Sequence, residues 1–284
     1  MQWLPEYLKR PIIDTEKTRL VRKILKDKCL NTVCDGARCP NKNECYSNNT
    51  ATFLIMGRVC TRNCRYCNIS AARPEPLDMN EPKHIAEAIE ELGLKFAVIT
   101  SVTRDDLEDG GAEHFINCIS EIRKICDAKI EILTPDFGIK SVDELARLDG
   151  IIKAHPEVFN HNIETVKHLF KIARPQGNYD ISLEILKYIK EHSDITTKSG
   201  LMVGLGETID EIEETLVDLK SAGVDILTIG QYIQPSKLHL ECAKFYTPKE
   251  FDSLKNLAGK IGFKNYQISP LTRSSYRALQ TYSE

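Results

Sequence analysis

Six of the ten cysteines in this 284-residue sequence lie in two short runs, and cysteine thiolates are the side chains that hold iron–sulfur clusters. The second run, "CTRNCRYC", contains Cys60, Cys64 and Cys67. Three thiolates on one tight loop can bind three irons of a cubane 4Fe–4S cluster and leave the fourth iron open to a small molecule. Zinc generally takes four ligands from paired C-x2-C units, which this run does not supply. The spacing therefore favours a cluster.

The first run, "CDGARCPNKNEC", contains Cys34, Cys39 and Cys45, and its spacing of four and then five residues is not a common zinc pattern. One site that used both runs would need six thiolates, which neither a mononuclear centre nor a cubane can use. Two centres are the simpler interpretation. The turn at Pro40 and the surrounding polar residues suit a loop that wraps a second cluster.

The composition indicates a cytoplasmic protein that is neither a general nucleic-acid binder nor a membrane protein. The net charge is −3, and the 42% hydrophobic content is enough to bury a sizeable core. No apolar stretch approaches the ~18–20 residues of a membrane span. The first residues are charged and interrupted by two prolines, Pro5 and Pro11, unlike a secretory signal. Clustered thiols in a reducing compartment favour metal binding over disulfides.

The other four cysteines are assigned no function. Cys118 and Cys126 fall in the helical pattern "EHFINCISEIRKIC", where a free cysteine usually behaves as a small buried hydrophobe. Cys242 is isolated. Cys29 lies five residues before Cys34, where a thiol could compete for iron, but we interpret it as a bystander.

Short apolar runs alternate with amphipathic ones from about residue 52 onward. The predicted strands lack strict polar alternation, as expected for a parallel sheet buried on both faces; they cover 52–59, 96–101, 129–134, 150–154 ("GIIKA"), 198–204 and 225–230. Helices are predicted between them, including "SVDELARLDG", which opens on a Ser141–Glu144 capping box. Six strand–helix units predict an α/β fold, a partial (β/α)6 TIM-type barrel.

This pattern predicts three parts: an N-terminal extension (1–51) with the first cysteine run, the barrel (52–262), and a short C-terminal tail (263–284) that contains "RSSY". The run "CTRNCRYC" directly follows the first predicted strand. Active sites of such barrels lie at the loops after the strand C-termini. The second run is therefore placed where a barrel-top active site requires it.

At this loop the sequence resembles the radical S-adenosylmethionine (radical SAM) superfamily, whose motif is C-x3-C-x-aromatic-C, with Tyr66 at the aromatic position. Further segments resemble the lipoyl synthase family within it: both cysteine runs with the linking residues, "TSVTRDDLEDGGAEHF", "VFNHNIETV", "KSGLMVGLGE", "TIGQYIQPS" and "RSSYRA". The resemblance extends from about residue 29 to 278. It is specific, since related radical enzymes lack the first cysteine run.

The resemblance implies two 4Fe–4S clusters and S-adenosyl-L-methionine as cofactors. Cys60, Cys64 and Cys67 would hold the cluster that cleaves S-adenosylmethionine to a 5′-deoxyadenosyl radical, within a barrel that excludes water. Cys34, Cys39 and Cys45 would hold an auxiliary cluster, with Ser274 or Ser275 as its fourth ligand; we favour Ser275. An alkoxide matches iron less well than a thiolate does, which suits a cluster that is consumed.

The implied reaction inserts two sulfur atoms, at carbons 6 and 8 of an octanoyl-lysine on a lipoyl carrier domain, and so forms the lipoyl cofactor. The implied partners are this carrier protein, a reducing electron donor and iron–sulfur assembly proteins. Residues 1–73 contain 14 Lys plus Arg against 6 Asp plus Glu, and we expect this basic region, including Lys23, Lys26 and Lys28, to help dock an acidic carrier domain. Alternatively, these charges balance acidic surface elsewhere.

Polar residues after the later strands are further candidates for cofactor contacts. Asn160, Asn162 and Glu164 follow the fourth predicted strand, where they could reach the nucleoside hydroxyls, although an Asn there could equally cap a helix. Gly204 and Glu207 belong to "GLGE" after the fifth strand, which could approach a ligand closely or form a plain strand-to-helix turn.

Other polar residues receive an ordinary interpretation. His155 and His161 are equally possible as site residues or as satisfied loop histidines, and neither is chosen; a solvated charge run is the ordinary interpretation of Arg104 with Asp105 and Asp106. Two rival functions remain: an iron–sulfur electron carrier without substrate, and a radical enzyme with another outcome, such as methylthiolation. The six β/α units argue against the carrier, and the lack of room for an extra domain after residue 262 argues against the second rival.

Overall fold

A computed structural model describes residues 4–11, 15–48 and 51–283 of the chain. Its main sheet has eight strands in the order β1-β2-β5-β6-β7-β8-β9-β10. Seven of them are parallel: β2 (Thr52–Ile55), β5 (Phe96–Ser101), β6 (Lys129–Leu133), β7 (Val158–Asn160), β8 (Thr196–Val203), β9 (Ile226–Gln231) and β10 (Asn265–Ile268). Strand β1 (Asn31–Thr32) pairs with β2 in the antiparallel direction.

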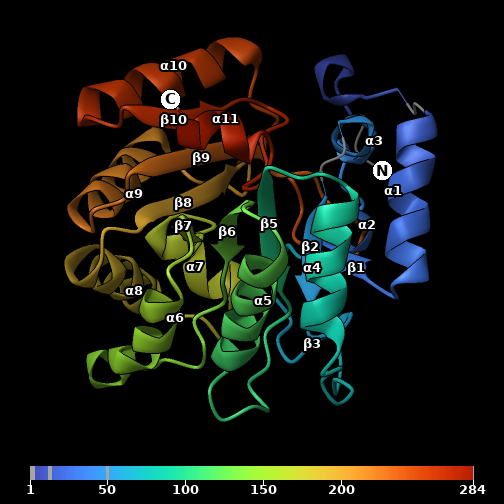
Figure 1. Cartoon of the computed structure of the whole chain (residues 1–284). Helices are drawn as coiled ribbons and strands as arrows, with labels where there is room; N and C mark the ends of the chain where they lie inside the picture. The colour runs from blue at the N-terminus through green and yellow to red at the C-terminus, as the bar shows by residue number, and fades with distance from the viewer. Residues whose placement is uncertain (1–3, 12–14, 49–50, 284) are drawn as a thin grey trace.

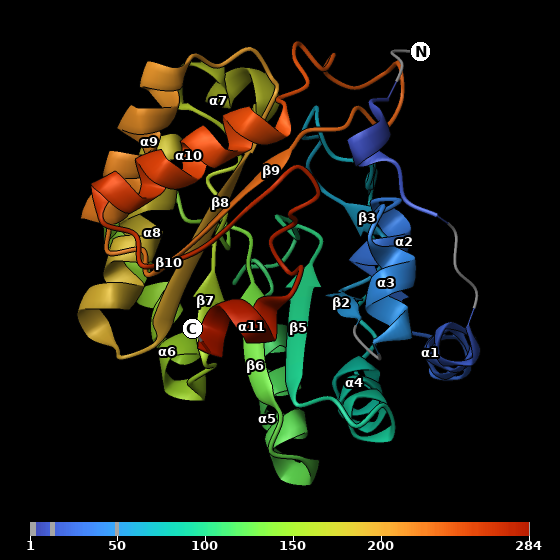
Figure 2. The same ribbon diagram turned by 90° about the horizontal axis from the view of Figure 1, so that it is seen from above.

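The sheet curves into an open, partial barrel. The strands form an arc when viewed from above (Figure 2), and no pairing among the described residues joins β10 back to β1 or β2. The arc confirms the predicted fold class. Inside it, Lys198 on β8 and Glu131 on β6 form an ion pair 2.9 Å long whose two side chains are each only 1% exposed.

Helices cover the outer face of the arc (Figure 1): α4 (Glu81–Glu91), α5 (Ala112–Ile125), α6 (Asp149–Ala154), α7 (Lys167–Ala173), α8 (Tyr179–His192), α9 (Ile209–Ser221) and α10 (Pro248–Ile261). Capping boxes begin α9, with Thr208 and Glu211, and α10, with Thr247 and Glu250. Each helix turns an apolar stripe toward the sheet; Ile85 and Ile89 of α4, for example, are fully buried. Burial of one such side chain contributes about 1.5–3 kcal/mol.

Two predicted elements differ from the structure. The apolar run at 150–154 belongs to α6, and the fourth strand of the series is β7, a few residues later. Short apolar runs suit a helix as well as a strand; here Ile151 is buried while Lys153 is exposed, so the run has one buried face. The segment from Ser141 forms the 3₁₀ helix η2 (Val142–Leu148), and the Ser141 side chain does not cap it.

Both terminal regions pack on the barrel rather than extending from it. The N-terminal region contributes η1 (Glu6–Leu8), α1 (Glu16–Asp27), α2 (Val33–Gly36), α3 (Lys42–Ser47) and strand β1. The predicted tail contains the last parallel strand, β10, and helix α11 (Ala278–Ser283). Ala278 of α11 packs on Phe96, Val98 and Val158, so this helix lies on the inner side of the arc (Figure 2).

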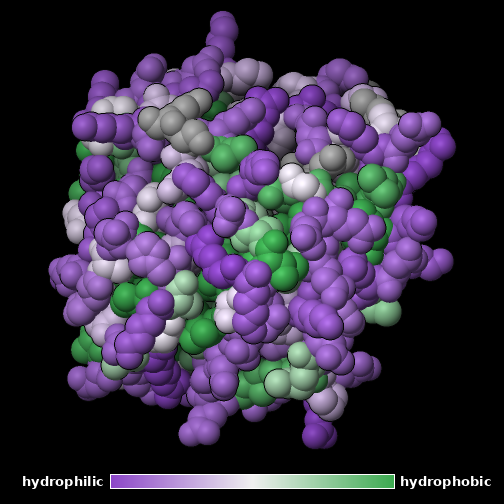
Figure 3. Space-filling model, viewed as in Figure 1, coloured by the Kyte–Doolittle hydropathy of each residue, from purple (hydrophilic) through white to green (hydrophobic). Residues whose placement is uncertain are grey.

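The surface carries few large apolar side chains. The face in Figure 3 is mainly hydrophilic, with small, separate apolar patches. Among the described residues, no helix is long and apolar enough to cross a membrane.

Candidate active site

The loop with the second cysteine run lies at the C-terminal ends of the strands. Cys60 belongs to the short strand β3 (Val59–Cys60), which pairs with β4 (Ser70–Ala71). Backbone amides point at the sulfurs: those of Thr103 and Arg62 donate to Cys60 Sγ at 3.3 and 3.4 Å, and that of Ile69 donates to Cys67 Sγ at 3.5 Å. Such N–H···S bonds surround cluster thiolates and tune their potential.

The cysteines of this loop are partly buried and lie close to one another. Burial, with the nearby Cys64 and Cys60, raises the pKa of Cys67 to about 12. Burial also raises the pKa of Cys64. A bound cationic iron centre would offset this cost, since metal binding favours the thiolate. No three His, Cys, Asp or Glu side chains of the described residues close around a single metal ion. Thiols grouped on one loop with amides aimed at them fit a multi-iron cluster.

The cysteines of the first run line a small cavity. Cys34, Cys39 and Cys45 line it together with Ser275, and its other walls include Thr52 and Arg273. Burial raises the pKa of both Cys34 and Cys45 to about 12, with further contributions from the neighbouring thiols. Three thiols and one hydroxyl around one cavity are a donor set that fits a cubane cluster.

The two serines of "RSSY" have different neighbours. Ser275 Oγ accepts a hydrogen bond of 2.8 Å from Thr52 Oγ1 at the cysteine cavity. Ser274 Oγ lies 2.7 Å from Asn162 Nδ2. The cavity with the three cysteines therefore contains Ser275, and Ser274 faces the residues that follow β7.

Tyr66, Asn162 and Glu164 lie in one group beside the second cysteine run. Asn162 Nδ2 is 3.2 Å from Glu164 Oε1, and the buried Asn162 Oδ1 has no hydrogen-bond partner among the residues that the structure describes. Glu164 has a left-handed backbone (φ 70°), and burial raises the pKa of its carboxyl group. The charge of Glu164 in turn contributes to the raised pKa values of Tyr66 and Cys64, which places the three side chains near one another.

Gly204 and Glu207 form a tight loop of their own. Both oxygens of Glu207 accept backbone N–H bonds, from Gly204 at 2.6 Å and from Leu205 at 2.8 Å. A Cβ on Gly204 would lie 2.3 Å from Gln231 Nε2, and its φ is +108°. Packing and backbone conformation therefore account for the glycine, and the Glu207 carboxylate stabilises the turn.

The interpretation of 104–106 as a solvated charge run holds for Asp105 and Asp106, which are exposed, but not for Arg104. Arg104 is 2% exposed and pairs with Asp106 at 2.8 Å. Asp105 binds the guanidinium of Arg62, a residue of the second cysteine run that the sequence analysis passed over. The run follows β5 at the crowded top of the barrel, where charges from neighbouring loops meet. The position of Arg62 between Cys60 and Cys64 was the feature of the sequence that could have pointed to it.

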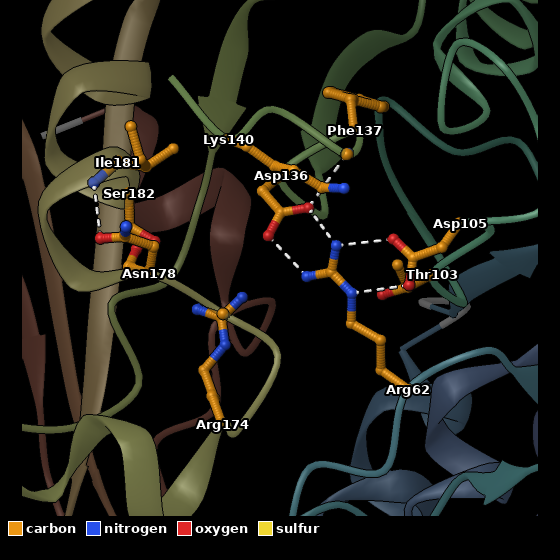
Figure 4. A network of polar contacts seen from close by, with 12 residues as sticks. Arg62, Thr103, Asp105, Asp136, Phe137, Lys140, Arg174, Asn178, Ile181 and Ser182 are labelled. Atoms are coloured by element: carbon orange, nitrogen blue, oxygen red, sulfur yellow. Dashed lines mark hydrogen bonds and ion pairs between the residues drawn. The ribbon is translucent and has the colours of Figure 1, made fainter. Parts of the chain in front are cut away.

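Arg62 is held by two carboxylates (Figure 4). Its guanidinium bonds to Asp105 at 2.6 and 2.8 Å and to Asp136, after β6, at 2.5 and 2.7 Å. Burial alone would raise the pKa of Asp136, but the bonds and charge of Arg62 outweigh it and hold that pKa below its usual range. The pairs fasten the cysteine loop to the ends of two strands, because the Arg62 amide also donates to Cys60.

Arg174 is a second buried guanidinium in this region (Figure 4). It donates to the Asn162 carbonyl at 3.0 Å and contributes its charge to the environment of Glu164 and Cys64. His161, next to Asn162, bonds through Nδ1 to the Thr134 carbonyl at 3.0 Å. Burial lowers its pKa to about 4, so it is a neutral, satisfied side chain. His155 is exposed and pairs with Asp194.

The partial barrel and the cysteine loop at its top define a radical SAM enzyme. The Radical SAM superfamily model matches residues 54–219. Among solved structures, methylornithine synthase shares the fold (TM-score 0.54, 14% identity, 87% of this chain and 70% of that one). Coproporphyrinogen III oxidase from Escherichia coli does so too (TM-score 0.53, 15% identity, 75% of this chain and 52% of that one).

Sequence relatives give the particular family. The lipoyl synthase of Caldicellulosiruptor saccharolyticus is 48% identical over 279 residues, which cover 98% of this chain and 96% of that protein. The lipoyl synthase of Caldanaerobacter subterraneus subsp. tengcongensis is 47% identical over 275 residues, or 96% and 95% of the two chains. The chain belongs to the lipoyl synthase family, and its cofactors are 4Fe–4S clusters and S-adenosylmethionine.

Proposed function

We propose that this enzyme inserts two sulfur atoms, at carbons 6 and 8 of a protein-bound octanoyl chain, and so makes the lipoyl group. Membership of the lipoyl synthase family over nearly the full chain supports the activity. The structural observation that supports this function is the cavity that groups Cys34, Cys39 and Cys45 with Ser275.

We propose a separate role for each group of residues. Cys60, Cys64 and Cys67 hold the radical cluster, while Cys34, Cys39, Cys45 and Ser275 hold the auxiliary cluster. When bound, the first cluster with S-adenosylmethionine supplies a hydrogen-abstracting radical, and the second supplies sulfur. The buried Arg62 pairs fix the loop of the first cluster, and the barrel wall keeps water from the reacting carbon.

Around the cofactor, we assign the contacts to S-adenosylmethionine to Tyr66, Asn162 and Glu164. Asn162 supports this assignment, because its buried Oδ1 has no partner in the described part of the chain, and a buried amide oxygen normally accepts a hydrogen bond. Gly204 and Glu207 are less suited to direct contact, since the Glu207 carboxylate is already bonded to two amides. Their contribution is the shape of the loop.

The substrate arm reaches the enzyme on a carrier protein, and we propose that α1 belongs to the docking surface. Lys23 and Lys26 are exposed on this helix. Lys28 is less available, because it pairs with Glu87 at 3.0 Å and with Glu91 at 3.6 Å. An electron donor and iron–sulfur assembly proteins complete the proposed partners. The ten free cysteines suit a reducing compartment, and we propose the cytoplasm. We retain three functional parts, 1–51, 52–262 and 263–284.

A single-turnover experiment tests the function. The enzyme with both clusters is incubated anaerobically with an octanoyl-lysine peptide, S-adenosylmethionine and a reductant. We expect two sulfurs in the product for two 5′-deoxyadenosines formed, with loss of the auxiliary cluster only. Deoxyadenosine without sulfur transfer would contradict the proposed substrate. An iron content of about four per chain, rather than about eight, would contradict the two-cluster assignment.

A further inference from the structure

Glu44 and Tyr276, which are adjacent in the chain to the proposed cluster ligands Cys45 and Ser275, form a hydrogen bond with each other. Glu44 precedes Cys45 in α3, and Tyr276 follows Ser275 in the C-terminal segment. The Tyr276 hydroxyl donates to Glu44 Oε1 at 2.7 Å across 232 positions of sequence. This bond links the cysteine loop to the serine segment directly, without any contribution from the cluster.

The same carboxylate is held by two guanidinium groups. Arg277 Nη2 is 3.4 Å from Glu44 Oε1, and Arg10 Nη2 is 3.8 Å from Glu44 Oε2. These cations keep the carboxylate ionised and oriented, and a hydrogen bond to an ionised acceptor is stronger than one between neutral groups. Tyr276 therefore has a charged and preoriented acceptor.

The backbone at Arg277 has an unfavourable conformation. Arg277 has a φ of 53°, a left-handed conformation that costs a non-glycine residue free energy and persists only where the surroundings enforce it. Leu271 lies four residues before Ser275, and its carbonyl accepts a hydrogen bond of 2.7 Å from the buried Asn41 side chain. The serine segment is thus tied to the cysteine loop on both sides of Ser275.

Tyr276 also lines two adjoining cavities. It lines the small cavity that contains the three cysteines and a larger cavity of about 590 Å³ beside Leu94, Phe96 and α11. Cys45 and Ser275 line both cavities as well.

From these contacts we infer that Glu44 and Tyr276 are positioning residues that hold Ser275 against the auxiliary cluster. The inference rests on the proposed function, since it takes Ser275 as the fourth ligand. Serine is a weak ligand to iron, so its occupancy depends on how firmly the protein holds the hydroxyl in place. The Glu44–Tyr276 bond supplies that restraint.

The test measures how fast ferrozine removes iron from the full-length enzyme with both clusters. We expect Tyr276→Phe and Glu44→Ala to release the first iron of the auxiliary cluster about tenfold faster than the wild type, the scale of one lost charge-assisted hydrogen bond. A three-iron cluster signal in the electron paramagnetic resonance spectrum should accompany it. Glu44→Gln should release iron more slowly than Glu44→Ala, since its amide oxygen still accepts from Tyr276 although the charge is lost.

The matched control is Tyr188→Phe, which removes a tyrosine–aspartate bond of the same 2.7 Å length on α8. It should leave iron release unchanged. Release rates should be the same in Ser275→Ala and in the double variant Ser275→Ala/Tyr276→Phe, because Tyr276 acts through Ser275.

The outcomes separate the inference from the proposed function. Fast release from Ser275→Ala with slow release from Tyr276→Phe would overturn the positioning role and leave the serine ligand standing. Additive effects in the double variant would also overturn the role, since Tyr276 would then act independently. Slow release from Ser275→Ala would show that Ser275 is not a ligand of the auxiliary cluster. This result would overturn the positioning role, while the single-turnover experiment tests sulfur transfer separately.

Discussion

Ser274 and Ser275 are adjacent in the chain, yet their hydroxyls belong to different sites. Ser275 Oγ bonds to Thr52 at 2.8 Å on the cavity of the first cysteine run, and Ser274 Oγ bonds to Asn162 at 2.7 Å beside the second. One short segment thus contacts both proposed cluster sites, and each serine is assigned by its neighbour rather than by its type.

The two serines should respond differently to substitution. We expect Ser275→Ala to lower the iron content of the auxiliary cluster and to abolish sulfur insertion, because the fourth donor is gone. Ser274→Ala should keep all the iron and weaken S-adenosylmethionine binding, because Asn162 loses a partner. Iron assays and S-adenosylmethionine titrations check this prediction. Equal iron loss in the two variants would contradict the assignment.

The Arg62 network should stabilise the fold mainly through Asp136. The Asp136 side chain is 7% exposed and that of Asp105 is 37% exposed. Removing one partner of a buried pair costs about 3–5 kcal/mol, whereas an exposed pair contributes about 0–1 kcal/mol. We expect Asp136→Asn to reduce the free energy of unfolding much more than Asp105→Asn.

Denaturant unfolding measures this difference, and iron retention by the radical cluster should follow the same order. Asp194→Asn serves as the control, because its pair with His155 is exposed and remote. A larger loss for Asp105→Asn than for Asp136→Asn would contradict the burial argument.

His161 should make the stability of the protein depend on pH. Its pKa is about 4 in the folded state and about 6.5 in an unfolded chain. As pH falls below about 6.5 the unfolded state takes up the proton first, so stability decreases until pH falls to about 4, by up to about 3 kcal/mol.

His161→Gln has no titrating group at this position and should lose less stability over the same range. Unfolding of both proteins in the same cluster state, at several pH values, checks the prediction. Parallel pH curves for the two proteins would show that His161 does not contribute.

Charge on α1 should affect binding of the carrier protein. Reversal of Lys23 and Lys26 to Glu should weaken binding of an acidic carrier domain about three- to tenfold at low salt and reduce its salt dependence. The Lys187→Glu control lies on α8, on the other side of the molecule from α1 (Figure 1). Reversal of Lys28 should mainly reduce stability, because it breaks the pairs with Glu87 and Glu91. Unchanged affinity for the Lys23 and Lys26 variants would exclude α1 from the docking surface.

The sequence alone determined the features that depend on local spacing. The thiols of Cys60, Cys64 and Cys67 are close in the chain, so one loop must bring them together, and the same holds for Cys34, Cys39 and Cys45. Long apolar and amphipathic segments also predicted the β/α alternation correctly. The run at 150–154 was wrongly assigned to a strand, although it belongs to a helix. Five residues are too few to distinguish the hydrophobic pattern of a strand from that of a helix, and only packing against the sheet decides between them.

Only the tertiary structure decided which distant groups meet. Asp105 is exposed, as the sequence suggests, but the parallel strands bring it and the buried Asp136 to the same Arg62 guanidinium. The choice between Ser274 and Ser275 and the bond from Tyr276 to Glu44 depend on how the C-terminal segment folds back onto the cysteine loop. Contacts that span more than a hundred residues follow from chain topology, which local spacing does not encode.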